Sequence, residues 1–110
     1  MLRSAGRAFA LAAALVLISG LLFSPYSAAK DHQVSIEGMK FVPETLEVAP
    51  GDTVTWTNKD FVPHTVSAGK ALESGTIEAN RSWKYVAKAK GRTEYVCRFH
   101  PGMRATLVVK

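Results

Sequence analysis

The chain has 110 residues, 47% of them hydrophobic, and carries a formal net charge of +5 at pH 7. This length predicts a single small domain. The basic residues are scattered instead of gathering on one periodic face, which argues against a nucleic-acid-binding surface. A single cysteine excludes an internal disulfide bridge.

The first 29 residues have the features of a secretory signal peptide. Arg3 and Arg7 precede an almost wholly apolar run over 8–22, and Ser27-Ala28-Ala29 offers small residues for cleavage before Lys30. The apolar run is shorter than the roughly 20 residues that a membrane span needs, so cleavage is favoured over an uncleaved anchor. We therefore predict a signal peptide at 1–29, one domain at 30–110, a periplasmic or secreted location, and no membrane span after cleavage.

Beyond Lys30, short runs of alternating apolar and polar residues predict an all-β domain. The predicted strands cover 33–37, 45–48, 53–57, 81–87, 92–97 and 105–109, with a loop at 68–80. Six to eight such strands indicate a two-sheet sandwich or a small barrel with Greek-key connections. The predicted core consists of Val34, Ile36, Leu46, Val54, Trp56, Tyr95, Leu107 and Val109.

A possible metal-binding motif follows the strand at 92–97, where Cys97, His100 and Met103 have the spacing Cys-x2-His-x2-Met. Thiolate, imidazole and thioether together suit copper. Zinc is the alternative metal, but structural zinc sites do not use methionine. An inert core cysteine is the ordinary explanation of a lone thiol. We expect Pro101-Gly102 to turn the chain so that His100 and Met103 lie on a tight loop.

A fourth ligand must come from elsewhere in the chain. His32 lies close to the predicted new N-terminus, where chain ends are poorly ordered, so we interpret it as a surface residue. His64 follows Pro63 at the start of an apolar run. Taken alone it has an ordinary explanation as a core or edge histidine, but it completes the set. Two histidines and a thiolate with a weak methionine ligand are typical of blue copper.

The chain resembles the cupredoxin family, and within it the amicyanin and plastocyanin-like branch. The matching residues are Pro50 to Trp56, Asn58, Pro63-His64 and Tyr95 to Met103, and the similarity covers essentially all of 31–110. Arg98, Phe99 and Gly102 depart from the amicyanin pattern. Thr65 stands where many cupredoxins have asparagine, and we expect its hydroxyl group to bond to the ligand loop instead.

This resemblance implies a Greek-key β-sandwich of seven to eight strands with one type 1 copper ion. The implied ligands are His64, Cys97, His100 and Met103. It also implies that the ring edge of His100 reaches the surface as the route for electrons. We expect Asn58 and Thr65 to orient the imidazole rings. Docking at an apolar rim and burial in the core both remain open for Phe61 and Phe99, whereas Pro63 and Pro101 are candidates for the rim alone.

The function implied by this resemblance is single-electron transfer, not enzyme catalysis. A multicopper enzyme needs a second copper centre, and the sequence contains no further ligand cluster. The implied partners are redox proteins such as a periplasmic dehydrogenase and a c-type cytochrome, and we expect a monomer. The alternative is a copper trafficking or tolerance protein that uses the same ligands without redox turnover.

Overall fold

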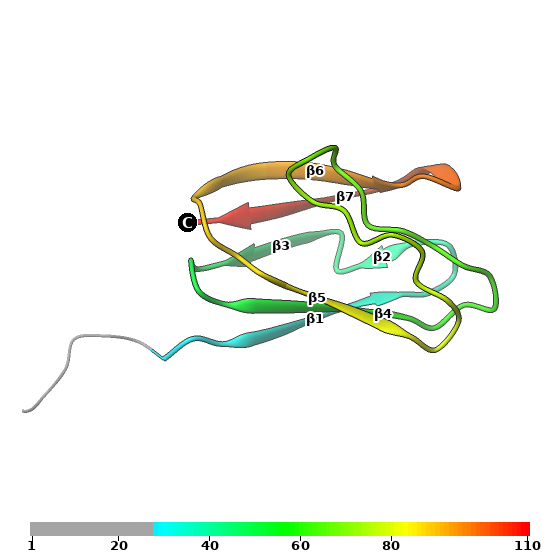
Figure 1. Cartoon of the computed structure of the whole chain (residues 1–110), viewed down its shortest axis with the longest axis horizontal. Helices are drawn as coiled ribbons and strands as arrows, with labels where there is room; N and C mark the ends of the chain where they lie inside the picture. The colour runs from blue at the N-terminus through cyan, green and yellow to red at the C-terminus, as the bar shows by residue number, and fades with distance from the viewer. Residues whose placement is uncertain (1–27) are drawn as a thin grey trace, which may run out of the picture.

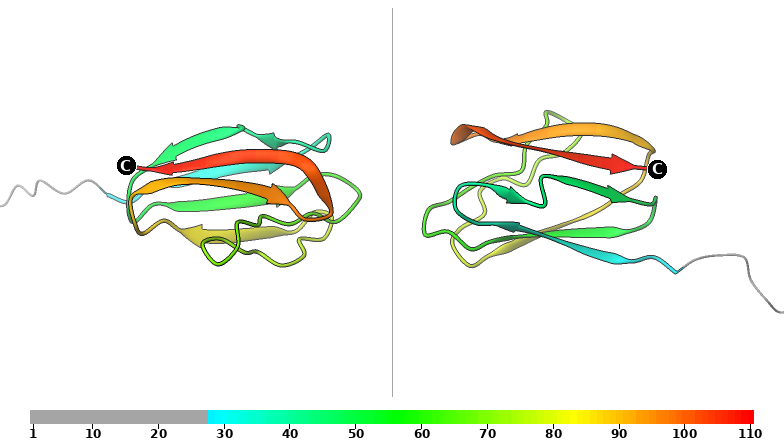
Figure 2. Two further views of the ribbon diagram at one scale, coloured as in Figure 1. Left: turned by 90° about the horizontal axis from the view of Figure 1, so that it is seen from above. Right: turned by 180° about the vertical axis from the view of Figure 1, so that it is seen from behind.

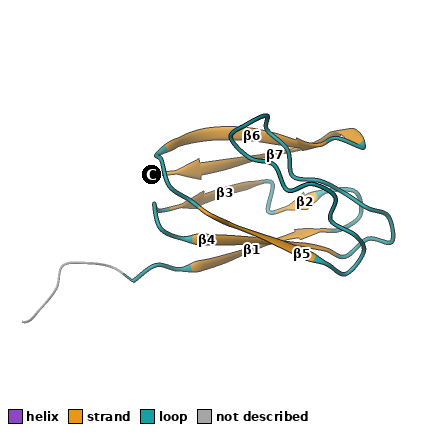
Figure 3. Cartoon of the chain, viewed as in Figure 1, coloured by secondary structure: helices purple, strands orange, loops and turns teal. Residues whose placement is uncertain are grey.

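The computed structural model describes residues 28–110, so residues 1–27 of the predicted signal peptide lie outside the described part. The described chain is built from strands and loops (Figure 3). The strands are β1 (Asp31–Ile36), β2 (Phe41–Val42), β3 (Thr45–Val48), β4 (Thr53–Asn58), β5 (Ser82–Val86), β6 (Gly91–Cys97) and β7 (His100–Val109). Residues 28–110 include no helix long and apolar enough to cross a membrane.

The seven strands form two sheets packed face to face, with strand orders β2-β1-β4-β5 and β3-β7-β6 (Figures 1 and 2). β1 pairs in parallel with β4, and β3 pairs in parallel with β7. Such pairs join segments distant in sequence, as Greek-key connections do. The predicted all-β sandwich of seven to eight strands is therefore confirmed.

The core lies between the two sheets, where the inward residues of each strand meet. Seven of the eight predicted core residues are buried, and Leu46 is partly buried against them. The centre is a cluster of aromatic rings. Trp56 donates a hydrogen bond from Nε1 to the hydroxyl group of Tyr95 at 3.0 Å, and the two rings meet edge to face. Burial of its hydroxyl group raises the pKa of Tyr95 to about 12.

The start of β1 is fixed by one buried carboxylate, Asp52. Its Oδ1 accepts a hydrogen bond from the backbone N–H of Lys30 at 3.0 Å, and its Oδ2 lies 2.9 Å from Nε2 of His32. The backbone N–H of Ala49 donates to Oδ2 at 3.0 Å. The prediction that His32 lies in a poorly ordered chain end is therefore wrong, because pairing of β1 with β4 orders the chain from Asp31 onward. Its side chain is partly exposed.

These contacts make the stability of the domain depend on pH in acid. Hydrogen bonds from Ala49, Lys30 and His32 lower the pKa of Asp52 from 3.8 to about 2. Because this pKa is lower in the folded state, the ionised carboxylate stabilises the fold at pH values above the ordinary pKa of 3.8. This contribution is lost as the pH falls from about 4 to about 2. We expect Asp52→Asn to lower the free energy of unfolding at neutral pH. The same substitution should make this free energy decrease less between neutral pH and acid.

Chemical denaturation at neutral pH and in acid measures both effects. The matched control is Asp31→Asn, since Asp31 is exposed and only one residue from His32. An Asp52→Asn protein whose stability falls in acid as steeply as that of the wild type contradicts the assignment.

Candidate metal centre

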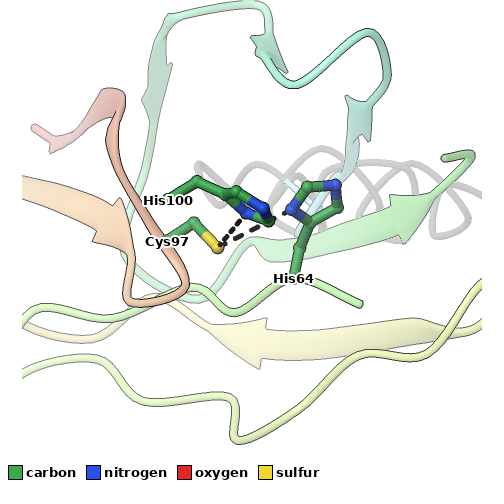
Figure 4. A group of neighbouring side chains, drawn as sticks. All are labelled: His64, Cys97 and His100. Carbon is green, nitrogen blue, oxygen red and sulfur yellow. Dashed lines mark hydrogen bonds between the residues drawn. The ribbon is translucent and has the colours of Figure 1, made fainter. Parts of the chain in front are cut away.

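Three of the four predicted ligands converge at one end of the sandwich. Nδ1 of His64 and Nδ1 of His100 each lie 3.6 Å from Sγ of Cys97 (Figure 4). One ligand atom from each residue lies within 4.8 Å of the other two. His64 and Cys97 are fully buried, whereas His100 is partly exposed. The arrangement offers two imidazole nitrogens and one sulfur facing a common point.

Cys97 and His100 are brought together by a tight hairpin between β6 and β7. They are paired across the turn residues Arg98 and Phe99, and the register shifts between Val96 and Cys97. The prediction that Pro101-Gly102 makes the turn is wrong, because both residues lie in β7. His100 and Met103 are likewise strand residues and not loop residues. The hairpin pairs Cys97 with His100, so the two side chains meet without a wide loop.

His64 reaches Cys97 because its segment is held to two neighbours. The backbone of His64 exchanges hydrogen bonds with Ile77 at 3.1 and 2.8 Å. Three residues later, Ser67 exchanges two bonds of 2.9 Å with Val96, the residue before Cys97. The apolar run around His64 forms only isolated bridges and not a continuous strand.

Asp60 orients the ring of His64, which the sequence interpretation did not identify. Its Oδ2 lies 2.9 Å from Nε2 of His64, and its two oxygens accept backbone hydrogen bonds from Gly38 at 2.7 Å and Met39 at 3.0 Å. Burial opposes ionisation, but the bonds from Met39, Gly38 and His64 outweigh it and lower the pKa of Asp60. A carboxylate there keeps the proton on Nε2 and leaves the lone pair of Nδ1 facing Cys97.

Asn58 and Thr65, predicted to orient the imidazoles, form hydrogen bonds to residues around the ligands and not to the rings. Asn58 Oδ1 accepts the backbone N–H of Asp60 at 2.9 Å, so Asn58 supports His64 indirectly. The side chain of Asn58 donates to the carbonyl groups of Val62 at 2.8 Å and Ile77 at 2.9 Å, which shapes the loop before His64. The hydroxyl group of Thr65 accepts the N–H of Arg98 at 2.9 Å, so its expected bond to the ligand loop is confirmed.

Thr65 also contacts the sulfur directly. Its backbone N–H lies 3.4 Å from Sγ of Cys97, inside the protein. A hydrogen bond from an amide to sulfur partly compensates the negative charge of a thiolate that has lost its water. Thr65 therefore ties the segment carrying one histidine to the hairpin that carries the other two groups.

Met103 is buried, with 5% of its surface exposed, three residues beyond His100 in β7. Met103 belongs to the hydrophobic core cluster of the domain. Its role as a weak fourth ligand stays a prediction.

Several exposed apolar residues lie next to the predicted ligands in sequence. Phe61 is 97% exposed and Phe99 is 50% exposed, which decides the open question of whether these rings pack in the core. Pro63 and Pro101 are exposed as well. We call the four residues Phe61, Pro63, Phe99 and Pro101 the apolar rim. Phe99 and Pro101 flank the partly exposed His100 in sequence, and Pro63 precedes His64.

The donor atoms of the centre determine which metals it suits. The buried sulfur of Cys97 with two imidazoles matches the three strong ligands of a blue copper site, and Met103 is the candidate for the weak methionine ligand. Hard cations such as Mg²⁺ and Ca²⁺ require oxygen ligands, which this cluster lacks among the described residues. Copper is the metal that the residues fit best.

Comparison with known proteins gives a consistent result. The sequence model of the cupredoxin-like domain family matches residues 8–109 of this chain. Amicyanin-alpha of Methylorubrum extorquens is 32% identical over 94% of this chain and 99% of its own length. Amicyanin of Paracoccus denitrificans is 34% identical over 79% of this chain and 74% of its own length. The methylamine utilization protein MauL of Methylophilus methylotrophus is 31% identical over 74% of this chain but only 50% of its own length.

Solved structures share the same architecture. An amicyanin mutant in its Cu(I) form superposes with a TM-score of 0.68 at 29% identity, covering 73% of this chain and 82% of that one. A purple cupredoxin from Nitrosopumilus maritimus gives a TM-score of 0.68 at 27% identity and covers 73% of this chain and 100% of that one.

Proposed function

Because this chain belongs to the cupredoxin family, we propose that it is a small blue copper protein that carries single electrons between redox partners. The observation that carries the proposal is the meeting of Nδ1 of His64, Sγ of Cys97 and Nδ1 of His100 within 4.8 Å, in a chain whose relatives include amicyanins. The protein is an electron carrier and not an enzyme.

His64, Cys97 and His100 are proposed as the strong ligands, with Met103 as the weak fourth. Bound copper supplies a one-electron couple between Cu(I) and Cu(II). The protein holds the ligands nearly still, since His64 is fixed by Asp60 and Ile77 and Cys97 by the hairpin. A site that cannot rearrange keeps the geometry similar in both oxidation states, which favours fast transfer.

The proposed route for electrons runs through His100 at the apolar rim. The rim suits brief docking, because exposed apolar residues release water when a partner contacts them. Such contact requires no buried ion pairs between the two proteins. We assign residues 1–29 as a signal peptide that is removed, residues 30–110 as the copper-binding domain, and the periplasm as its location. The relationship to amicyanins and to MauL supports a periplasmic dehydrogenase as donor and a c-type cytochrome as acceptor.

The proposal is tested by loading the purified domain with Cu(II) and recording its visible spectrum and reversible reduction. We expect one copper ion per chain at the centre that contains Cys97, an intense blue thiolate-to-copper absorption, and a reversible one-electron wave in voltammetry. A copper-loaded protein that is colourless and does not cycle contradicts electron transfer and supports trafficking or tolerance.

Asp60→Asn is expected to weaken copper binding by about 10- to 100-fold, because hydrogen-bond partners of metal-bound histidines typically contribute that much. The amide keeps the size of the side chain but places no charge beside Nε2 of His64, 2.9 Å away in the wild type. Competition with a copper chelator, followed by the blue absorbance, measures the change.

The matched control is Asp52→Asn, which alters the other aspartate–histidine pair of the domain, also 2.9 Å apart. It should leave the affinity measured by the blue absorbance unchanged. Equal weakening by both substitutions contradicts a specific role of Asp60.

A further inference from the structure

At the opposite end of the sandwich, the start of the domain offers backbone nitrogens and the ring of His32 as further metal ligands, so the expectation of no further ligand cluster is incomplete. The N-terminal end of β1 and the C-terminus lie together there, far along the sandwich from the β6–β7 turn (Figure 1). The first residues of the domain are Lys30, Asp31 and His32. With residues 1–29 removed, as proposed above, the backbone nitrogen of Lys30 becomes a free α-amino group and histidine becomes the third residue.

We propose that the mature N-terminus, Lys30-Asp31-His32, is a second metal site, selective for copper(II) or nickel(II). Its four ligands are the α-amino nitrogen of Lys30, the backbone nitrogens of Asp31 and His32, and Nδ1 of His32. Four nitrogens in this order close three adjoining chelate rings around one ion. Square-planar nitrogen coordination is the geometry that copper(II) and nickel(II) prefer.

Asp52 already holds the two outer ligands of this set on one carboxylate. The nitrogen of Lys30 lies 3.0 Å from Oδ1, and Nε2 of His32 lies 2.9 Å from Oδ2. Asp52 is itself 95% buried, with an exposed fraction of 5%. A proton on Nε2 donated to this carboxylate places the lone pair of the His32 ring on Nδ1, the atom that closes the chelate. Asp52 is therefore a positioning residue for the site.

The site is also open to a metal ion. A pocket of about 470 Å³ lies beside it, and Lys30, His32 and Asp52 are among its lining residues. Ala28 and Ala29 line the same pocket, so removal of the leader takes away part of its wall.

Metal binding competes only with the end of the β1–β4 ladder. Asp31 and His32 are the first two residues of β1 and pair with Thr53 and Val54. The α-amino group and the two amides release their protons to solvent when the metal binds, so binding strengthens as the pH rises. Only the hydrogen bonds of Asp31 and His32 are lost. The later pairs of the two strands, from Gln33 with Thr55 to Ile36 with Asn58, stay in place.

The test uses the domain with Lys30 as its first residue, loaded with one equivalent of copper for the centre at Cys97 and freed of any other copper, and nickel(II) ion as the probe. We expect calorimetry to show one nickel(II) ion bound per chain, with the visible absorption of a square-planar nickel centre. The control is the same domain beginning at Ala29, which makes histidine the fourth residue and breaks the chelate. Its nickel affinity should fall by at least about 100-fold, since linked ligands gain that much from their effective concentration. His32→Gln should lose nickel to the same degree.

The blue absorbance of the centre at Cys97 should be the same in all three proteins, which separates this inference from the electron-transfer proposal. Nickel binding of equal strength in the domain that begins at Ala29 overturns the site, as does the absence of nickel binding when Lys30 is first. Mass spectrometry of the exported protein gives its first residue, and any residue other than Lys30 also overturns it.

Discussion

Replacing Cys97 with serine is expected to abolish the blue colour of the copper-loaded protein. The sulfur atom faces both imidazole nitrogens at 3.6 Å, so it is the only described group placed to give a thiolate-to-copper absorption. A serine hydroxyl group is not ionised at neutral pH and is a harder ligand than sulfur. The visible spectrum and the metal content after dialysis measure the result.

The control for this experiment is His32→Gln, which removes a histidine at the other end of the sandwich and should keep the full blue absorbance. The fold of Cys97→Ser is checked by circular dichroism, since serine has nearly the same size and the fold is not expected to change. Retention of the blue band by a folded Cys97→Ser protein would show that the thiol is not a ligand.

Truncation of Trp56 to alanine is expected to cause the largest loss of stability, about 3–5 kcal/mol in the free energy of unfolding. Trp56 is fully buried, contacts Tyr95 edge to face with ring centres 5.7 Å apart, and packs on Trp83 with ring centres 5.5 Å apart. Its removal leaves a cavity between the sheets and takes the hydrogen-bond partner from the Tyr95 hydroxyl group. Denaturation in urea or guanidinium chloride measures the loss.

Trp83→Ala is the matched control, because Trp83 is the same residue type and pairs directly with Trp56 across β4 and β5. It is only partly buried, so its truncation should destabilise the domain clearly less. A loss as large as that of Trp56→Ala contradicts the view that the core is centred on Trp56 and Tyr95. Where Trp56→Ala does not fold, Tyr95→Phe tests the same cluster by removing only the hydroxyl group that accepts the Trp56 bond.

Much of the fold was predictable because alternation is a local property of the chain. Val54 and Trp56 alternate with threonines, and both lie in the core as predicted. β3 covers the predicted range, Thr45–Val48. The burial of Phe41 and Ile77 was missed, because neither residue belongs to a long alternating run. Their burial depends on which distant segments cover them.

The sequence predicted which residues converge at the candidate metal centre, but not the hydrogen bonds that hold them there. Cys97 and His100 stand out by spacing, and His64 by elimination of His32. Asp60 was missed because its significance depends on Gly38 and Met39, which lie in the β1–β2 connection and hold its carboxylate from another part of the fold. No spacing rule links residues 38 and 60.

The sequence by itself determined the all-β class, the apolar faces of the strands, and the cysteine and histidines available to a metal. These features depend only on residue type and on local alternation. Only the tertiary structure decided where the chain turns between Cys97 and His100, which aspartate orients His64, and that His32 is paired with Asp52. The physical reason is that strand register and long-range hydrogen bonds depend on partners distant in sequence. A turn dipeptide such as Pro101-Gly102 becomes part of a strand when its neighbours pair across two other residues.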